Sequence, residues 1–201
     1  MFKLIPAEEK HLDQIAPLLM ETGYYDIAAV NNKLNLPAAE FYKIQTLLPY
    51  LKYTSVLIST EAAAGEEFAG YCITLTKAHI EEVEKNAPYW FADDPALERI
   101  WEQIDQFYLD NSNEHIIAYS AAIHPNYRGK GLYRVIHQYR QTMAKQYDCS
   151  KIVLIVWQQK SSKAYQIHQH YGYKYVGEID CGDFFEDKLT DKLIKGVLEL
   201  A

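Results

Sequence analysis

The residues with the clearest chemical meaning are HPNYRGKGLYRVI, positions 124–136, where two glycines flank Lys130 and arginines stand on either side. An apolar helical pattern begins directly after Gly131. Successive backbone N–H groups in a glycine turn at a helix N-terminus point at one place and share the positive end of the helix dipole. Arg128 and Lys130 add full positive charges. The stretch therefore predicts a site for a pyrophosphate, and such a site needs no metal.

Two nucleotide-binding patterns fail at this loop. A P-loop, GxxxxGK[ST], requires a hydroxyl residue after its lysine, but Gly131 follows Lys130. A dinucleotide fingerprint, GxGxxG, requires a third glycine where this chain has Arg134. That fingerprint also belongs to an early strand–turn–helix, whereas this loop comes after residue 120. What remains is a strand, then HP-x-x-RGKG, then a long amphipathic helix.

The elements around the loop alternate between strand and helix. Strands are expected at 115–123, 151–157 and 173–179, and helices at about 131–147 and 161–171. This alternation predicts a βαβ unit with parallel strands and hence an α/β fold. The first of these helices should bury an apolar stripe made of Leu132, Val135, Ile136, Tyr139 and Met143.

The first half of the chain contains no recognisable motif. It predicts a short strand at 2–7, a helix at 12–20 that Pro17 should kink, and a further helix from about Asn35. SVLIST and FAGYCITL predict a hairpin because a turn sequence, AAAGEE, joins them. No repeat or linker interrupts the chain, so residues 1–201 are expected to form one domain.

Charge is distributed unevenly along the sequence. Residues 78–114 hold ten acidic residues against two basic ones, and a helix is expected to open there at Pro95. Residues 124–151 hold six basic residues against one acidic residue. The two segments suggest an anionic cofactor and a cationic substrate. A plain solvated surface explains the acidic segment equally well.

The overall composition excludes several classes of protein. The net charge of −7 and the pI near 5.5 argue against nucleic-acid binding, which needs a basic face. No apolar run approaches the ~18 residues that cross a bilayer, and the N-terminus lacks the pattern of a signal peptide. The three cysteines are far apart and fit neither a disulfide framework nor a zinc site. The expectation is a soluble, cytoplasmic protein that contacts neither membrane nor nucleic acid.

Two motifs in register give the sequence its resemblance to a family. Residues 128–132, RGKGL, resemble the acyl-CoA loop [RQ]-x-x-G-x-[GA] of the GNAT superfamily of N-acetyltransferases. The preceding Ile123-His124-Pro125 matches the hydrophobic-x-Pro that usually stands there. Further on, Ala164, Gly172 and Tyr173 keep the spacing of the family pattern A-x-x-x-Y-x-x-x-G-[FY]. The order of elements also matches, most closely over residues 115–180.

The resemblance implies a fold and a reaction. The implied fold is a mixed, mostly antiparallel central sheet with a parallel βαβ unit, splayed central strands and helices on both faces. The implied reaction moves the acetyl group of acetyl-CoA directly to a primary amine of a small molecule or peptide, without a metal. Insertions at about 23–54 and 78–114 would shape the acceptor site, and a homodimer stays open. The alternative is a noncatalytic acyl-CoA-binding protein or sensor with the same fold.

The resemblance also carries over candidate cofactor-binding positions. They comprise the strand end, the loop and two positions at the second motif: Ala121, Ala122, Ile123, Arg128, Gly129, Lys130, Gly131, Leu132, Tyr133, Arg134, Ser161 and Ala164. A backbone N–H among the first three would serve as oxyanion donor. Two positions depart from the family pattern, because Tyr133 replaces a glycine or alanine and Ser161 replaces an asparagine.

The catalytic groups are less well marked. The tyrosine that usually acts as general acid falls on His168, with Tyr165 and Tyr171 behind it on the same short helix. His168 is the predicted acid, although packing between helix and sheet would explain it equally well. The strand before the loop has no glutamate to act as base. Tyr119 is the candidate base, while Ser120 acting through water, Glu114, His124 and a chain of waters stay open.

Overall fold

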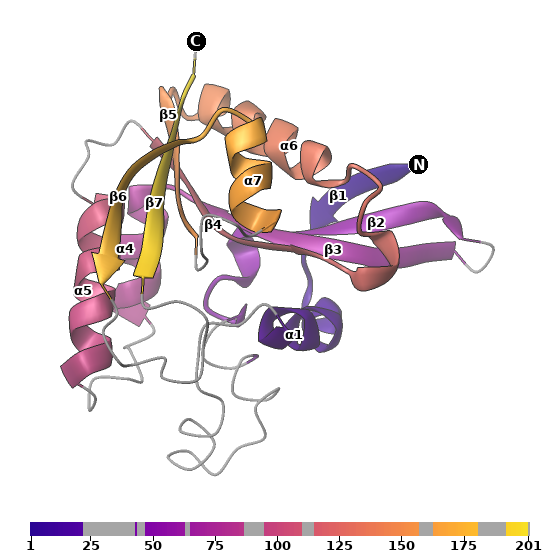
Figure 1. Ribbon diagram of the computed structural model, residues 1–201. Helices are drawn as coiled ribbons and strands as arrows, with labels where there is room; N and C mark the ends of the chain where they lie inside the picture. The colour runs from indigo at the N-terminus through magenta and orange to yellow at the C-terminus, as the bar shows by residue number, and fades with distance from the viewer. Residues whose placement is uncertain are drawn as a thin grey trace. The chain divides into compact units, whose positions relative to one another are not determined.

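The computed structural model describes residues 1–21, 43, 47–62, 65–86, 95–109, 115–156, 163–180 and 192–200. The chain forms two compact units. The first comprises Met1–Thr74, Glu82–Ala87 and Ser120–Tyr139, and the second comprises Leu75–Glu81, Pro88–Tyr119 and Arg140–Ala201. Strand β4 (His115–Ile123) contributes its first half to the second unit and its last residues to the first. The strand order of the seven-stranded sheet is β1-β2-β3-β4-β5-β7-β6 (Figure 1).

The first unit is built on an antiparallel meander. Strand β1 (Phe2–Pro6) pairs with β2 (Thr54–Ala62), which pairs with β3 (Gly65–Leu75). The predicted hairpin is therefore confirmed. Along β3 and β4, Ala69 meets His124 and Tyr71 meets Ser120, so the two strands run in opposite directions.

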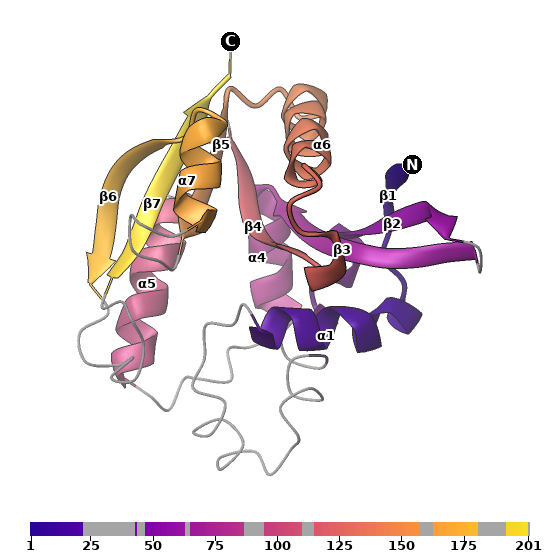
Figure 2. The same ribbon diagram turned by 45° about the vertical axis from the view of Figure 1, so that its right-hand side comes forward.

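Helices cover both faces of the first unit's sheet. Helix α1 (Leu12–Glu21) lies on one face, and the start of α6 (Tyr133–Gln146) lies on the other (Figure 1 and Figure 2). The apolar stripe of α1 is buried as its spacing predicts. The helix continues through Pro17, which is exposed. Its start follows a short 3-10 turn, η1 (Glu9–His11), where the Nδ1 atom of His11 accepts the backbone N–H of Glu8 at 2.9 Å.

The second unit contains the parallel pair. Strand β5 (Lys151–Val156) runs parallel to the first half of β4, and α6 connects them, so the predicted βαβ unit is confirmed. The β4–β5 ladder joins only His115–Ile117 to Lys151–Val153 within the described residues, although both strands continue. Such an early end to the ladder is what splayed strands require. The other pairs in this unit are antiparallel, from β5 to β7 (Lys192–Glu199) and from β7 to β6 (Lys174–Asp180). Strand β7 had no prediction from the sequence.

Helices also cover both faces of the second unit's sheet. On one face, Met143 and Ala144 of α6 and Tyr165 of α7 (Lys163–His170) pack on a core that includes Ile116, Ile152 and Leu198. On the other face, α5 (Pro95–Leu109) places Phe107 under Lys195, whose Nζ lies 5.4 Å from the ring centroid. The described parts thus have the expected mixed α/β architecture.

The described parts of the acidic segment are helical. Helix α5 begins at Pro95, as predicted, but α4 (Lys77–Asn86) had no prediction. Ile80 and Val83 are buried one turn apart on α4, while Glu81 and Lys85 are exposed. Glu98 and Glu102 of α5 are exposed as well, which agrees both with a solvated surface and with a surface that attracts a cationic substrate.

Several predicted features lie outside the described residues. They are most of the helix expected from Asn35 and the residues Glu114 and Ser161. Among the described helices, none is long and apolar enough to span a membrane.

Candidate functional site

The glycine loop of the first unit depends on backbone conformations that only glycine adopts easily. Gly129 has φ +78° and Gly131 has φ +71°, both in the left-handed region. A Cβ atom added at either position would meet no atom within 4 Å. The glycines are therefore required by their backbone angles and not by a lack of space.

The loop presents a run of backbone N–H groups. The N–H of Arg128 donates to the oxygen of Pro125 at 3.2 Å, and that of Arg134 donates to the oxygen of Gly131 at 3.1 Å. Between these two, the N–H groups of residues 129–132 have no acceptor in the described part of the chain. They stand at the N-terminus of the 14-residue helix α6, where the helix dipole adds positive potential. Such an arrangement binds an anion.

Tyr127 fixes the loop to the sheet, although no separate role was predicted for this residue. It ends the 3-10 turn η4 (Pro125–Tyr127), and its ring is buried with Leu57 and Ala69 of the hairpin. Its phenol hydrogen-bonds to Glu67 and to Ser59, and the bond to the carboxylate raises the pKa of Tyr127. An aromatic residue inside an otherwise polar, glycine-rich loop was the signal that could have marked it as an anchor.

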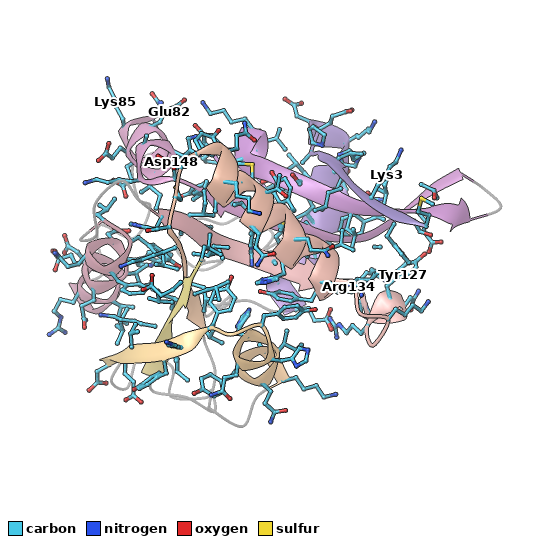
Figure 3. All side chains as sticks on the ribbon, turned by 90° about the horizontal axis from the view of Figure 1, so that it is seen from above. Lys3, Glu82, Lys85, Tyr127, Arg134 and Asp148 are labelled. Carbon is cyan, nitrogen blue, oxygen red and sulfur yellow. The ribbon has the colours of Figure 1, made fainter. Side chains whose placement is uncertain are left out.

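The basic side chains of the loop differ in what they contact. Arg128 donates from Nε to the oxygen of Ile123 at 3.0 Å and pairs with the carboxylate of Glu21 at 3.1 Å. Lys130 lies with its Nζ 4.8 Å from the centroid of the Tyr127 ring. Figure 3 labels Tyr127 in the turn and Arg134 in the first turn of α6, where the Arg134 side chain is exposed. In the part of the chain that the structure describes, neither Lys130 nor Arg134 pairs with a carboxylate.

The basic segment is less basic at the surface than its sequence suggests. Arg140 was counted with the other cations of residues 124–151, but only 2% of it is exposed. It lies one turn after Ile136 on the buried side of α6. The surface charge near the loop therefore comes from Arg128, Lys130 and Arg134.

The end of β4 presents its backbone in two directions. The N–H of His124 donates to the oxygen of Ala69 at 2.9 Å, and the oxygen of Ala122 lies beside Gly70, so these groups face β3. Because successive residues of a strand turn their backbone groups to opposite sides, Ala121 and Ile123 face away from β3. The oxygen of Ile123 is the one that accepts from Arg128. Of the three predicted strand positions, Ala121 and Ile123 are the ones that can offer an N–H to a ligand.

Gly70 sets how closely β3 approaches this strand end, and the sequence pointed to no function for it. A Cβ atom at Gly70 would lie 2.5 Å from the oxygen of Ala122 and 3.2 Å from the Cα of Ile123. Both are backbone atoms, so no side-chain rotation can relieve the overlap. An isolated glycine inside a strand pattern is the usual signal for such a close approach.

The second motif forms the end of α7 in the second unit. Gly172 has φ +88°, its N–H donates to the oxygen of Gln169 at 2.9 Å, and the N–H of Tyr173 donates to the oxygen of His168 at 3.1 Å. These bonds make a Schellman cap, which explains the glycine physically. The cap brings the rings of His168 and Tyr173 to 5.5 Å at 62°. Ala164 packs on the core of this unit at the start of the helix.

The candidate bases have structural contacts in their own units. The Tyr119 ring lies 6.3 Å from that of Tyr108. The hydroxyl of Ser120 is hydrogen-bonded to that of buried Tyr71 at 2.9 Å, and the Nδ1 atom of His124 accepts the N–H of Asn126 at 3.4 Å. Across the described residues, no group of three or more His, Cys, Asp or Glu side chains could hold a metal ion.

Comparison with known proteins finds similarity in structure but not in sequence. No family model matches the chain, and no curated protein matches its sequence. The C-terminal condensation domain of Ebony, in complex with beta-alanyl-dopamine, has a TM-score of 0.64 at 11% identity, with 100% of this chain and 99% of that chain covered. A GNAT-family acetyltransferase from Listeria monocytogenes has a TM-score of 0.53 at 13% identity, with 99% and 95% covered. YncA from Salmonella typhimurium, with its cofactor acetyl-CoA, has a TM-score of 0.54 at 16% identity, with 100% and 94% covered.

Proposed function

We propose that this chain, which has the fold of the GNAT acetyltransferases, transfers an acetyl group from acetyl-CoA to a primary amine of a small molecule or peptide. The observation that carries the proposal is the run of N–H groups of residues 129–132 at the N-terminus of α6. In this proposal residues 1–201 act as one catalytic domain, and the active protein is a monomer or a homodimer.

The chemistry of the loop fits the pyrophosphate of CoA. The four amides would donate to its oxygens, and Lys130 and Arg134 would add charge without a metal. Arg128 would hold the loop against β4 through Ile123, and its charge is shared with Glu21. Ala121 and Ile123, with backbone groups turned away from β3, would hold the pantetheine arm and the thioester oxygen.

The reaction needs two proton movements. The acceptor amine has a pKa near ~10.4 as an ordinary alkylamine, so it must lose a proton before its lone pair attacks the thioester carbon. A carbon–nitrogen bond then forms, the carbon–sulfur bond breaks, and the electron pair leaves with sulfur. The thiolate, with a pKa near ~8.5, takes up a proton as it departs. We assign the acid to His168 and the base to Tyr119.

Substitution of His168 tests the assignment of the acid. His168→Phe is expected to lower kcat by about tenfold or more, because general acids typically contribute ~10²–10⁴-fold and a thiolate is already a good leaving group. His168→Tyr should retain most of the activity, since its phenol supplies a proton donor in place of the imidazole. Steady-state kinetics at saturating acetyl-CoA measure the effect, and melting temperatures check the cost of changing the ring contact with Tyr173. Equal turnover of His168→Phe and wild type would remove His168 from the mechanism.

The Glu21–Arg128 pair leads to a second expectation. Glu21→Gln should raise the affinity for CoA by about two- to fivefold, because a carboxylate beside the proposed pyrophosphate site is removed and exposed pairs of this kind are worth ~0.2–1 kcal/mol. Calorimetric titration at low and high salt measures it, and the gain should shrink as salt screens the charges. The control is Glu8→Gln, which also removes an exposed, ion-paired carboxylate; the partner of Glu8 is Lys10. Weaker binding by Glu21→Gln would mean that this pair supports the site instead.

A direct assay decides between the enzyme and the alternative function. Purified protein is incubated with acetyl-CoA and a panel of small amines and peptides, and free thiol is followed over time. Thiol release that depends on the acceptor is expected, together with a melting temperature that rises with CoA. Saturable CoA binding without acceptor-dependent thiol across the panel would favour a noncatalytic acyl-CoA sensor. Absence of CoA binding would overturn both functions.

A further inference from the structure

We infer that Tyr127 is a positioning residue for the proposed acyl-CoA loop, because its buried ring joins the loop to Leu57 and Ala69 of the β2–β3 hairpin and also carries Lys130. The inference rests on the proposed function and adds to it a residue outside the glycine run itself. The two ends of the Tyr127 side chain have separate tasks, which makes them separable by substitution.

The phenol end holds the loop to two neighbouring strands. Ser59 of β2 and Glu67 of β3 are directly opposite each other in the ladder, and the Tyr127 hydroxyl hydrogen-bonds to both. Phe2 of β1 meets the Tyr127 ring edge-on, with centroids 5.6 Å apart at 84°. The phenol therefore attaches the residue immediately before Arg128 to β2 and β3, while Phe2 adds only apolar packing at the ring edge.

The contact with Glu67 favours the protonated form of the Tyr127 phenol. The carboxylate raises the pKa of Tyr127 above its ordinary value, so the phenol keeps its proton at neutral pH and continues to donate. Only alkaline conditions would remove this donor and place a phenolate beside a carboxylate.

The ring end orders a cation. Lys130 is exposed, and its Nζ lies 4.8 Å above the Tyr127 ring, within the range of a cation–π interaction. A lysine side chain loses considerable rotamer freedom when it is held in place. By restricting Lys130 before any ligand arrives, the ring lowers the ordering cost of binding an anion at the loop. Arg128 is held differently, by Ile123 and Glu21.

Three variants distinguish the effects of the Tyr127 hydroxyl and of the Tyr127 ring from a general loss of packing. Tyr127→Phe removes the hydroxyl and keeps the ring, whereas Tyr127→Leu removes both. Phe2→Leu removes a ring from the same cluster without changing the support of Lys130, and serves as the control. Each is titrated with CoA and with 3′-dephospho-CoA, and each is assayed with acetyl-CoA and with S-acetylpantetheine, which lacks the pyrophosphate. Melting temperatures are measured on the same samples.

The expected result is graded and specific for the pyrophosphate. Tyr127→Phe should weaken CoA binding about threefold, the size of a modest net hydrogen bond, and Tyr127→Leu about tenfold once the cation–π contact is also lost. The loss should be equal for CoA and 3′-dephospho-CoA. The KM for acetyl-CoA should rise while kcat stays within about twofold. With S-acetylpantetheine both variants should match Phe2→Leu.

Other outcomes would overturn the inference. If Tyr127→Leu binds CoA as tightly as Phe2→Leu, or if kcat falls while KM is unchanged, Tyr127 only stabilises the fold. An equal loss with S-acetylpantetheine would show an effect that does not pass through the pyrophosphate. If wild-type protein binds no CoA, the proposed function fails and the inference fails with it. Normal wild-type binding with unaffected Tyr127 variants removes the inference alone.

Discussion

Gly131→Val is expected to weaken CoA binding by about tenfold, and Gly129→Val combined with Gly131→Val by about a hundredfold. Both glycines have φ between +70° and +80°, where an ordinary residue costs ~1–2 kcal/mol and a β-branched residue is an outlier. The loop would relax to negative φ, and its N–H groups would no longer point at one place. Calorimetric titration with CoA measures the loss.

The controls for this prediction separate backbone angle from bulk. Gly131→Asn should bind CoA more tightly than Gly131→Val, because asparagine tolerates the left-handed region. Gly177→Ala, whose Cβ would only touch Lys195 at 3.6 Å, should bind like wild type. Since the added Cβ atoms at the loop meet nothing within 4 Å, the cost of the loop variants comes from the backbone angle alone, and their melting temperatures should fall by a few degrees at most, while Gly177→Ala should keep that of wild type. Equal losses for the Asn and Val variants would show that side-chain bulk matters and the backbone angle does not.

Gly70→Ala is expected to have the largest effect on stability. The new Cβ would overlap the oxygen of Ala122 at 2.5 Å, so β3 or the end of β4 must move. Overpacking of this kind typically costs ~1–3 kcal/mol, which corresponds to a melting temperature lower by several degrees. Because Ala121 and Ile123 belong to the displaced strand end, kcat for acetyl transfer should fall as well. Denaturant unfolding and steady-state kinetics measure the two effects.

Gly196→Ala is the matched control for Gly70→Ala. Its Cβ would lie 2.9 Å from Cδ1 of Leu154, which is the end of a flexible side chain that can rotate away. A smaller loss of unfolding free energy is therefore expected than at Gly70. If the two variants lose the same amount, the close approach of β3 to β4 is not a special constraint of the site.

Much of the fold around the site follows from local patterns. The βαβ unit, the hairpin and the helix that opens at Pro95 were all predicted, because periodicity and capping residues act over a few positions. The loop conformation was also within reach, since two glycines before a helical pattern predict positive φ. Strand β7 and helix α4 were not predicted. In α4 only Ile80 and Val83 are buried, and two residues make a weak periodic signal.

The contacts of the residues around the loop could not be predicted from local sequence patterns. The sequence predicts Arg128 to be a cation available to the ligand. In the structure it donates a hydrogen bond to the oxygen of Ile123 and forms an ion pair with Glu21. Arg140 reads as part of a basic surface but is buried. Tyr127 and Gly70 act through contacts with other strands.

There is a physical reason why the loop could be predicted from the sequence and its surrounding contacts could not. Backbone angles, caps and amphipathic periods depend on neighbours along the chain, so the glycine loop and its helix are encoded in residues 124–136. Salt-bridge partners, cation–π contacts and the distance between two strands depend on residues that only folding brings together. The local sequence therefore determines that a run of backbone N–H groups, suited to an anion, stands before α6. The packed sheet determines which side chains hold that site in place, and how closely β3 approaches β4.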